Sequence, residues 1–456
     1  MDKNICIKFL NHISNNIKDT DNPIIDHNKI YNKYWNNNKL NIECLIEKLF
    51  NQIRLIINST NQQLQYNKHI KWDPIIHKYP ICYLYYIESK STSTSTSKST
   101  STSTSKSNIN FETFNKKINK REIKLNNNIN YKSYIQEYIN STIDNSIIDI
   151  LNKLQNGIFI SLDIKLYVEN NINNCFIYMF EHLNLYIFNN DKIFDNTIRD
   201  KLVLNIYRIT KWIYNLNPIK KITLYYLDTI IDKRIIKDIN YLCSQNINSG
   251  LSTTEYIMIW RREEVLKVLI HELIHYLNID LKHNTQLEKI IDYPIGIFNY
   301  PILINETITE LQAQLFNILY ILISDNINSP ISDIIKLFKI FYNLEQIFSW
   351  YQFTKIMNYF SINSFDIESI KENFNQSTNV YSYFILKSIL SMYFFDILYE
   401  LDYIKKLIKQ DIRDKYLMID KVKNIIDNLP IVFLNKIIKN QHMNDDSLRM
   451  TIFGYF

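Results

Sequence analysis

The sequence predicts an α+β protein in which a small mixed sheet precedes a mostly helical C-terminal half. Before residue 260, helical patterns alternate with candidate strands that are rich in β-branched and aromatic residues: Gly157–Val168, Lys221–Asp228 and Glu255–Trp260. After residue 310, apolar residues recur almost entirely at helical spacing. A strongly apolar helical pattern with two histidines lies between the two parts. We therefore expect this helix to stand where the sheet meets the helical half.

Residues 1–128 are expected to form a mostly helical N-terminal region. The clearest pattern runs from Asn41 to Ile57, where apolar residues recur at steps of three and four. From residue 89 to residue 108 the chain is mainly a Ser/Thr alternation interrupted by lysines. A strand of this composition would be polar on both faces and could bury no core. We expect a disordered insertion there.

Residues 129–284 are expected to contain the sheet. Helical patterns cover Tyr131–Leu154 and Asn196–Leu216, on either side of the first candidate strand. A turn at Asn246–Gly250, which holds one of only four glycines, comes just before the last candidate strand. That strand, Glu255–Trp260, leads directly into the helix with the two histidines. Residues 285–456 are expected to form a helical C-terminal subdomain.

The histidine helix contains the motif His271-Glu272-Leu-Ile-His275, an H-E-x-x-H. Residues i and i+4 of a helix lie on one face, so both imidazoles can reach one metal ion with Glu272 beside it. Neutral imidazoles suit Zn²⁺, and a catalytic zinc takes three protein ligands with water in the fourth position. The other interpretation is that His271 and His275 are two core histidines that are buried with hydrogen-bond partners and bind no metal.

A third ligand is available further along the chain. In the segment Ile304–Ala313, Glu306 and Glu310 are spaced i, i+4 and therefore share a helical face. One of these carboxylates can complete the metal site while the other supports a ligand. The residues alone leave open which carboxylate does which.

The H-E-x-x-H motif, followed by Asn305-Glu306-Thr-Ile-Thr-Glu310, resembles the gluzincin metallopeptidases. In that family a Glu in an N-E-x-x-x-[D/E] helix completes the motif. The resemblance implies a zincin-like fold and one zinc ion per chain, held by His271, His275 and Glu306. It also implies that Glu310 orients a ligating imidazole, and that the third ligand lies in the C-terminal subdomain.

The resemblance has two further implications. Gluzincins often place an oxyanion-stabilising Tyr or His downstream of the third ligand, and Tyr381 and Tyr383 are the candidates here, although core packing is the alternative for both. Zinc peptidases of this kind also pair extended substrate with a sheet edge above the metal. Glu255–Trp260 is the candidate edge, and an internal strand is the alternative.

Composition restricts the partners. The net charge of +6 is spread along the chain, and the aromatic residues follow apolar segments without interleaving with arginine, so nucleic-acid binding is unsupported. The most apolar late stretch, Tyr383–Tyr399, is interrupted by Lys387 and Asp396, which makes it too polar for a membrane span. A peptide or protein substrate is the expected partner.

Cysteine usage and the N-terminus predict an intracellular protein in a reducing compartment. Five widely spaced cysteines form no C-x-x-C pair, and the chain starts without a signal-peptide pattern. Few glycines and abundant Ile, Asn and Lys are typical of an AT-rich genome. The segments Trp260–Val268 and Asp445–Thr451 are similar to zinc-peptidase-like proteins of giant DNA viruses related to mimivirus, which implies a host-cytoplasm or virion setting.

The sequence thus leaves two hypotheses of different class. The first is a zinc metallopeptidase in which Glu272 is the general base. The second is a non-catalytic structural or binding protein with the same fold, such as a virion component. Glu272 favours the first hypothesis, because a structural zinc needs no base and is usually closed by four ligands, often cysteines, and no cysteine lies near the motif.

Overall fold

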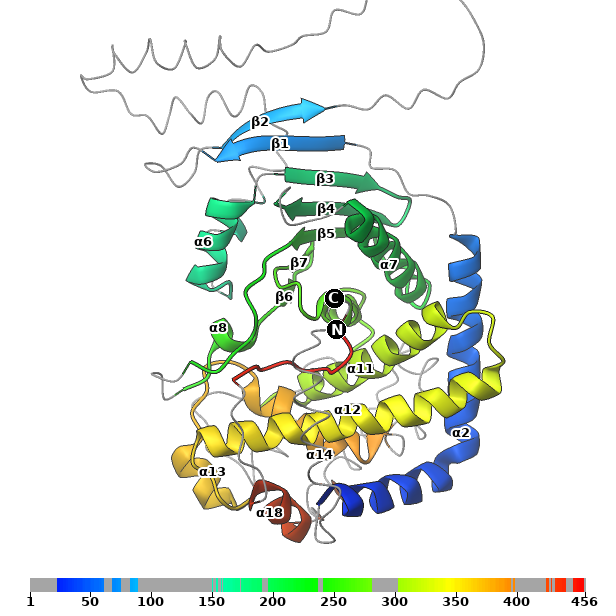
Figure 1. Cartoon of the computed structure of the whole chain (residues 1–456), viewed down its shortest axis with the longest axis vertical. Coiled ribbons are helices and arrows are strands. Elements are labelled where there is room, and N and C mark those ends of the chain that lie inside the picture. The colour runs from blue at the N-terminus through cyan, green and yellow to red at the C-terminus, as the bar shows by residue number, and fades with distance from the viewer. Residues whose placement is uncertain are drawn as a thin grey trace, which may run out of the picture.

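A computed structural model provides the structure of the 456-residue chain. It describes residues 23–60, 68–74, 83–88, 150, 153–154, 157, 159–172, 174–190, 196–236, 241–280, 302–394, 397, 424–425, 428, 431–439 and 446–454. Over these residues the protein has the mixed α+β composition that the sequence predicts. A sheet occupies one end of the view in Figure 1, and a group of long helices occupies the other.

The described strands form one mixed sheet in the order β2-β1-β3-β4-β5-β7-β6. Strands β4, β5 and β7 are parallel neighbours, whereas β1–β3 and the edge strand β6 pair antiparallel. The strand bounds are β1 Lys68–Pro74, β2 Tyr83–Glu88, β3 Asn174–Met179, β4 Leu183–Asn189, β5 Ile222–Leu227, β6 Gly250–Ser252 and β7 Ile257–Ile259. Parallel pairing of β4 with β5 needs a crossover, which the helix α7 (Asn196–Tyr214) provides.

The sheet is covered on both faces. Successive side chains of a strand point to opposite faces, so neighbouring residues of one strand belong to two different cores. On β5, Leu224 and Tyr226 belong to the main core, which they share with α7 and with α9 (Val265–Tyr276). Tyr225 and Leu227 belong to a second core on the other face, under α6 (Leu162–Asn171). The helix α9 is therefore held directly against the sheet.

The helical half packs on the other side of α9. Helix α11 contacts both α9 and α12, and α2 crosses α7, α11 and α12. Figure 1 shows α2 running along one side of the molecule, beside α7, α11 and α12. The bounds are α2 Pro23–Ser59, α8 Ser244–Ile247, α11 Ile304–Asp325, α12 Ile331–Tyr359, α13 Ile367–Asn373, η1 Tyr381–Leu386, α14 Lys387–Ser391 and α18 Ile431–Lys439.

The predicted strand Gly157–Val168 is wrong. Residues 162–171 form the helix α6. The buried residues Ile160, Ile164, Val168 and Ile172 recur every four positions, which is helical spacing. The β-branched composition of this segment suggested a strand, but its burial period is that of a helix.

Other expectations for the elements have different outcomes. The N-terminal region is helical over Pro23–Ser59, but β1 and β2 were not expected, and β1 pairs with β3 of the same sheet. The predicted helix at 196–216 and the strand at 221–228 are confirmed by α7 and β5. The Ser/Thr-rich stretch at 89–108 lies outside the described residues, as does most of the predicted helix at 131–154. In the described part of the chain no helix meets the length and hydropathy needed for a membrane crossing.

Candidate metal centre

The helix α9 positions the motif residues, and it lies between β6, β7 and α11. It is buried along almost its whole length, and apart from Lys267, Glu272 and the two histidines its residues are mainly apolar. Gly250 of β6 allows the edge strand to approach this helix closely. A Cβ atom at Gly250 would lie 2.8 Å from Oε1 of Glu272 and 2.8 Å from Cγ1 of Val268, closer than packed atoms allow.

His271, His275 and Glu306 come together to form a group that could hold a metal ion. The Nε2 atoms of the two histidines are 3.2 Å apart, and each lies 3.4 Å from Oε2 of Glu306. Zinc bonds of about 2.0–2.2 Å at tetrahedral angles separate ligand atoms by roughly 3.3–3.6 Å. The three atoms therefore fit one face of a zinc tetrahedron. The prediction that Glu306 joins the two histidines is confirmed.

Each imidazole is oriented by a carboxylate on its other nitrogen. Nδ1 of His271 lies 3.0 Å from Oε2 of Glu310, and Nδ1 of His275 lies 2.8 Å from Oδ2 of Asp280. In each pair the carboxylate accepts a hydrogen bond from Nδ1–H, which leaves the lone pair of Nε2 directed at the centre. Glu310 thus has the supporting position that the resemblance implied.

The protein groups alone form a strongly coupled charge cluster. Burial would raise the pKa of Glu306, but the neighbouring His275 and His271 outweigh it and hold that pKa well below its usual range. Burial would lower the pKa of His275, but Glu306 and Asp280 raise it well above its usual value. A cation held by these ligands must therefore displace protons from the imidazoles.

Glu272 lies beside the ligands on the wall of the cavity. Its side chain is only 8 % exposed, and burial raises the pKa of its carboxyl, although the nearby histidines oppose this. The neighbouring Ser252 of β6 also opposes the effect of burial on this pKa. A carboxylate whose pKa is raised above its usual value is better suited both to take up and to release a proton.

Of the two candidate tyrosines, the structure brings only Tyr383 to the centre. The Tyr383 hydroxyl donates a 2.9 Å hydrogen bond to Oε2 of Glu306, and its ring lies edge-on to that of His271. Tyr381 is 1 % exposed and packs edge-on against Phe374 in the core. Side chains two residues apart in a helical turn point to nearly opposite sides, so only one of the pair can face the centre.

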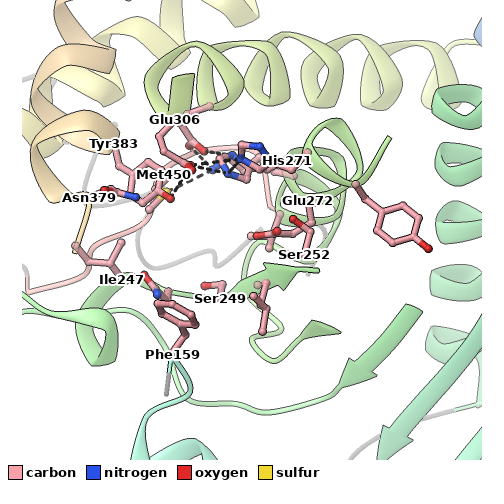
Figure 2. A pocket seen from close by; sticks show the side chains of 18 of the residues that line it. Phe159, Ile247, Ser249, Ser252, His271, Glu272, Glu306, Asn379, Tyr383 and Met450 are labelled. Carbon is pink, nitrogen blue, oxygen red and sulfur yellow. Dashed lines mark hydrogen bonds and ion pairs between the residues drawn. The ribbon is translucent and has the colours of Figure 1, made fainter. Parts of the chain in front are cut away.

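The centre opens into a cavity of about 640 Å³. Figure 2 shows Phe159 across this cavity from Glu306. Polar residues of the β6 segment, Ser249, Ser252 and Thr253, form part of the wall. The candidate edge Glu255–Trp260 is wrong, because β7 pairs with β5 on one side and with β6 on the other. The edge strand beside the centre is β6.

Asp280, the partner of His275, was not predicted from the sequence, although the end of α9 offers a local indication of it. Asn278 adopts a left-handed conformation with φ of 51° just after α9, a common way to end a helix. The chain reverses there, and Asp280 comes back to His275. An acidic residue five positions after the second histidine, beyond an Asn at a helix end, could have been considered as a partner.

The chain was compared with protein-family models, curated proteins and solved structures. None of the three comparisons gives a match.

Proposed function

We propose that this protein is a zinc-dependent metallopeptidase that hydrolyses peptide bonds. The observation that carries the proposal is the geometry of three ligand atoms at 3.2–3.4 Å from one another, with Glu272 beside them in the cavity wall. Two imidazoles and one carboxylate are a donor set typical of catalytic zinc. The zincin-like fold and Zn²⁺ as the metal are parts of the same proposal.

Glu272 is assigned the role of general base and then general acid. Zinc, when bound, would acidify a water molecule and polarise the scissile carbonyl. Glu272 takes a proton from the attacking water as the C–O bond forms. It then gives the proton to the amide nitrogen as the C–N bond breaks, so that a carboxylate and an amine are released. The raised pKa of Glu272 suits both transfers.

Tyr383 is assigned the role of hydrogen-bond donor to the carbonyl oxygen as it gains negative charge. Burial, together with the nearby Glu306, raises the pKa of its phenol well above the usual value, so the hydroxyl keeps its proton at neutral pH. A neutral donor that is already in place strengthens its bond as charge develops.

The edge strand β6 is assigned the role of substrate-binding strand. It is the last strand in the order of the described sheet, where it pairs with β7, and its residues Gly250–Ser252 line the cavity. An extended peptide can add to such an edge through main-chain hydrogen bonds, whatever its side chains. This arrangement supports a polypeptide substrate over a small molecule.

The test compares wild type with Glu272→Gln, which keeps the size of the side chain but removes the base. Both proteins should carry about one zinc per chain. Wild type should cleave members of a diverse peptide library, with new termini read by mass spectrometry, and Glu272→Gln should lose at least about 100-fold in turnover.

The matched control is Glu255→Gln, which alters a glutamate that is 75 % exposed. This variant should cleave like wild type. If the zinc-loaded wild type cleaved no peptide, the non-catalytic structural or binding role would be favoured. Equal cleavage by wild type and Glu272→Gln would exclude Glu272 as the base.

A further inference from the structure

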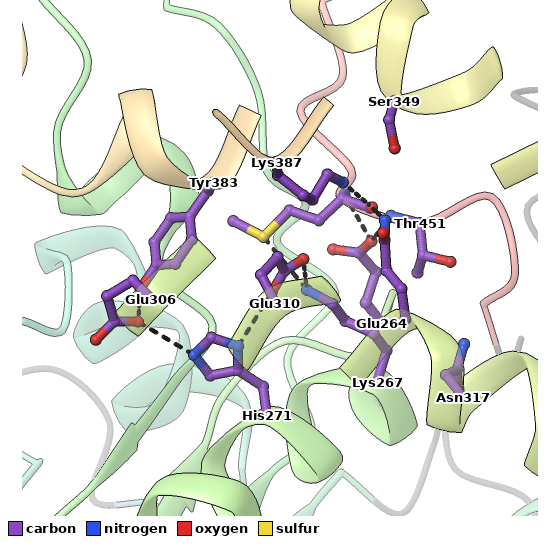
Figure 3. Close-up of polar contacts among 12 residues, drawn as sticks. Glu264, Lys267, His271, Glu306, Glu310, Asn317, Ser349, Tyr383, Lys387 and Thr451 are labelled. Carbon is purple, nitrogen blue, oxygen red and sulfur yellow. Dashed lines mark hydrogen bonds and ion pairs between the residues drawn. The ribbon is translucent and has the colours of Figure 1, made fainter. Parts of the chain in front are cut away.

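A buried charged cluster adjoins the metal centre (Figure 3), and two of its members, Lys267 and Glu310, also border the cavity. We define it as Glu264, Lys267, Glu310, Glu345 and Lys387, which come from α9, its N-terminal end, α11, α12 and α14. Each of these side chains is at most 2 % exposed. Buried charges are costly unless they are paired, so the partners of each charge determine what the cluster can do.

Lys267 is the member that connects the cluster to the metal ligands. It lies one helical turn before His271 on the same face of α9, and its ammonium forms an ion pair with Oε1 of Glu310. The other oxygen of Glu310 binds Nδ1 of His271 at 3.0 Å. Figure 3 shows Glu310 between the two side chains. The two oxygens of Glu310 are thus held by different partners.

The segment Ser447–Thr451 provides a second contact to Lys267. The ammonium of Lys267 lies 3.4 Å from Sδ of Met450. The main chain of Met450 is itself fixed, because its N–H donates to Glu264 at 2.7 Å and its carbonyl accepts from Gln314 at 2.7 Å and from Lys387 at 2.8 Å. Lys267 therefore has little freedom to leave Glu310.

We propose that Lys267 is a positioning residue of the metal centre. It holds the Glu310 carboxylate in the orientation that accepts from Nδ1 of His271, and the Ser447–Thr451 segment keeps Lys267 in place. The proposal rests on the metal site of the proposed function, but it does not depend on peptidase activity. It assigns Lys267 no contact with substrate.

The sign of the effect separates positioning from simple electrostatics. Lys267 is a positive charge close to a cation site, so Coulomb repulsion alone would make its removal strengthen metal binding. Loss of a residue that orients a ligand through its outer partner instead weakens binding, by about 10–100-fold in known sites. The two explanations therefore predict changes in opposite directions.

The experiment measures zinc affinity by competition with a chelator in Lys267→Met, which keeps an unbranched side chain of similar length. We expect binding that is about 10–100-fold weaker than in wild type, together with a changed visible spectrum of the cobalt-substituted protein.

The matched control is Lys355→Met. Lys355 is also buried, and its ammonium donates to the Ser447 carbonyl at 2.7 Å, so its replacement leaves in place the three hydrogen bonds that fix Met450 beside Lys267. This control should keep the wild-type zinc affinity and cobalt spectrum. Unchanged or tighter zinc binding by Lys267→Met would overturn the proposal.

A double-mutant cycle tests whether Lys267 acts through Glu310. Glu310→Gln and Lys267→Met/Glu310→Gln should have the same zinc affinity within about twofold, since Lys267 has nothing to position once the carboxylate is gone. Independent, additive losses would contradict the mechanism. The double variant lacks both charges, so this comparison remains available if the single Lys267→Met protein fails to fold. All readouts are metal binding, so a failure of the peptidase proposal would be seen separately.

Discussion

At the scale of single residues, Tyr383 is the group whose role the geometry makes most specific. Its hydroxyl contacts Glu306, whereas Tyr381, two positions earlier, is enclosed in the core. The sequence could give both tyrosines as candidates because they share one helical segment. It could not choose between them, since the choice depends on which side of η1 faces α9 and α11.

Tyr383→Phe tests this assignment. We expect the variant to keep about one zinc per chain and to lose roughly 100-fold in turnover, because a donor to the developing oxyanion is removed while all three ligands remain. Tyr381→Phe is the matched control and should retain turnover close to that of wild type. Steady-state kinetics on a peptide cleaved by wild type, with metal analysis of each protein, would measure both. A Tyr383→Phe enzyme with full activity would remove Tyr383 from the mechanism.

At the scale of elements, β6 and α6 are two that the sequence patterns did not predict. β6 has only three residues, too few for a periodic signal, and it lies between the predicted turn, which it overlaps at Gly250, and the predicted strand that begins at Glu255. The segment at 157–172 has both β-branched composition and a four-residue burial period, and the period decided its structure. By contrast, α9 and α11 were predictable because their apolar patterns are long, and the spacing of Glu306 and Glu310 is internal to one helix.

The close approach of β6 to α9 makes a prediction for Gly250→Ala. The added methyl group would meet the Glu272 carboxylate and Val268 at 2.8 Å, so the strand or the Glu272 side chain must shift. We expect a loss of about 1–3 kcal/mol in the free energy of unfolding, and a fall in turnover with zinc content maintained. Urea denaturation and peptide hydrolysis would measure these changes. Gly157→Ala, at a glycine in another part of the chain, should leave turnover unchanged.

At the scale of the whole molecule, the metal centre is assembled from segments far apart in the chain. Lys267 and Met450 are separated by 183 positions, and Tyr383 and Glu306 by 77. The H-E-x-x-H motif predicted that its two histidines lie side by side as candidate ligands, since their spacing is fixed by one helix. The positions of the buried charged residues next to the centre depend on how α9 packs against the Ser447–Thr451 segment. No local sequence pattern predicts this packing.

Two buried histidines outside the metal centre, one in α2 and one beside the sheet, make the free energy of unfolding depend on pH. His27 of α2 stacks on Tyr31, and His182 lies between β3 and β4 with Nε2 3.2 Å from Oγ1 of Thr210. Burial lowers the pKa of each from 6.5 to about 4. The folded state therefore binds fewer protons than the unfolded state between these values. The stabilisation is complete above pH 6.5 and is lost as the pH falls toward 4.

The corresponding measurement is urea denaturation at pH 7 and pH 5 with a chelator present, so that metal binding does not contribute. At pH 5 the loss should be about 2 kcal/mol for each histidine relative to pH 7. His27→Gln and His182→Gln should each reduce the pH dependence of the unfolding free energy by about that amount, because glutamine does not titrate. The other titrating groups remain in every variant and cancel in the comparison. A variant that keeps the full wild-type pH dependence would show that the histidine it replaces is already protonated, or freely hydrated, in the folded protein.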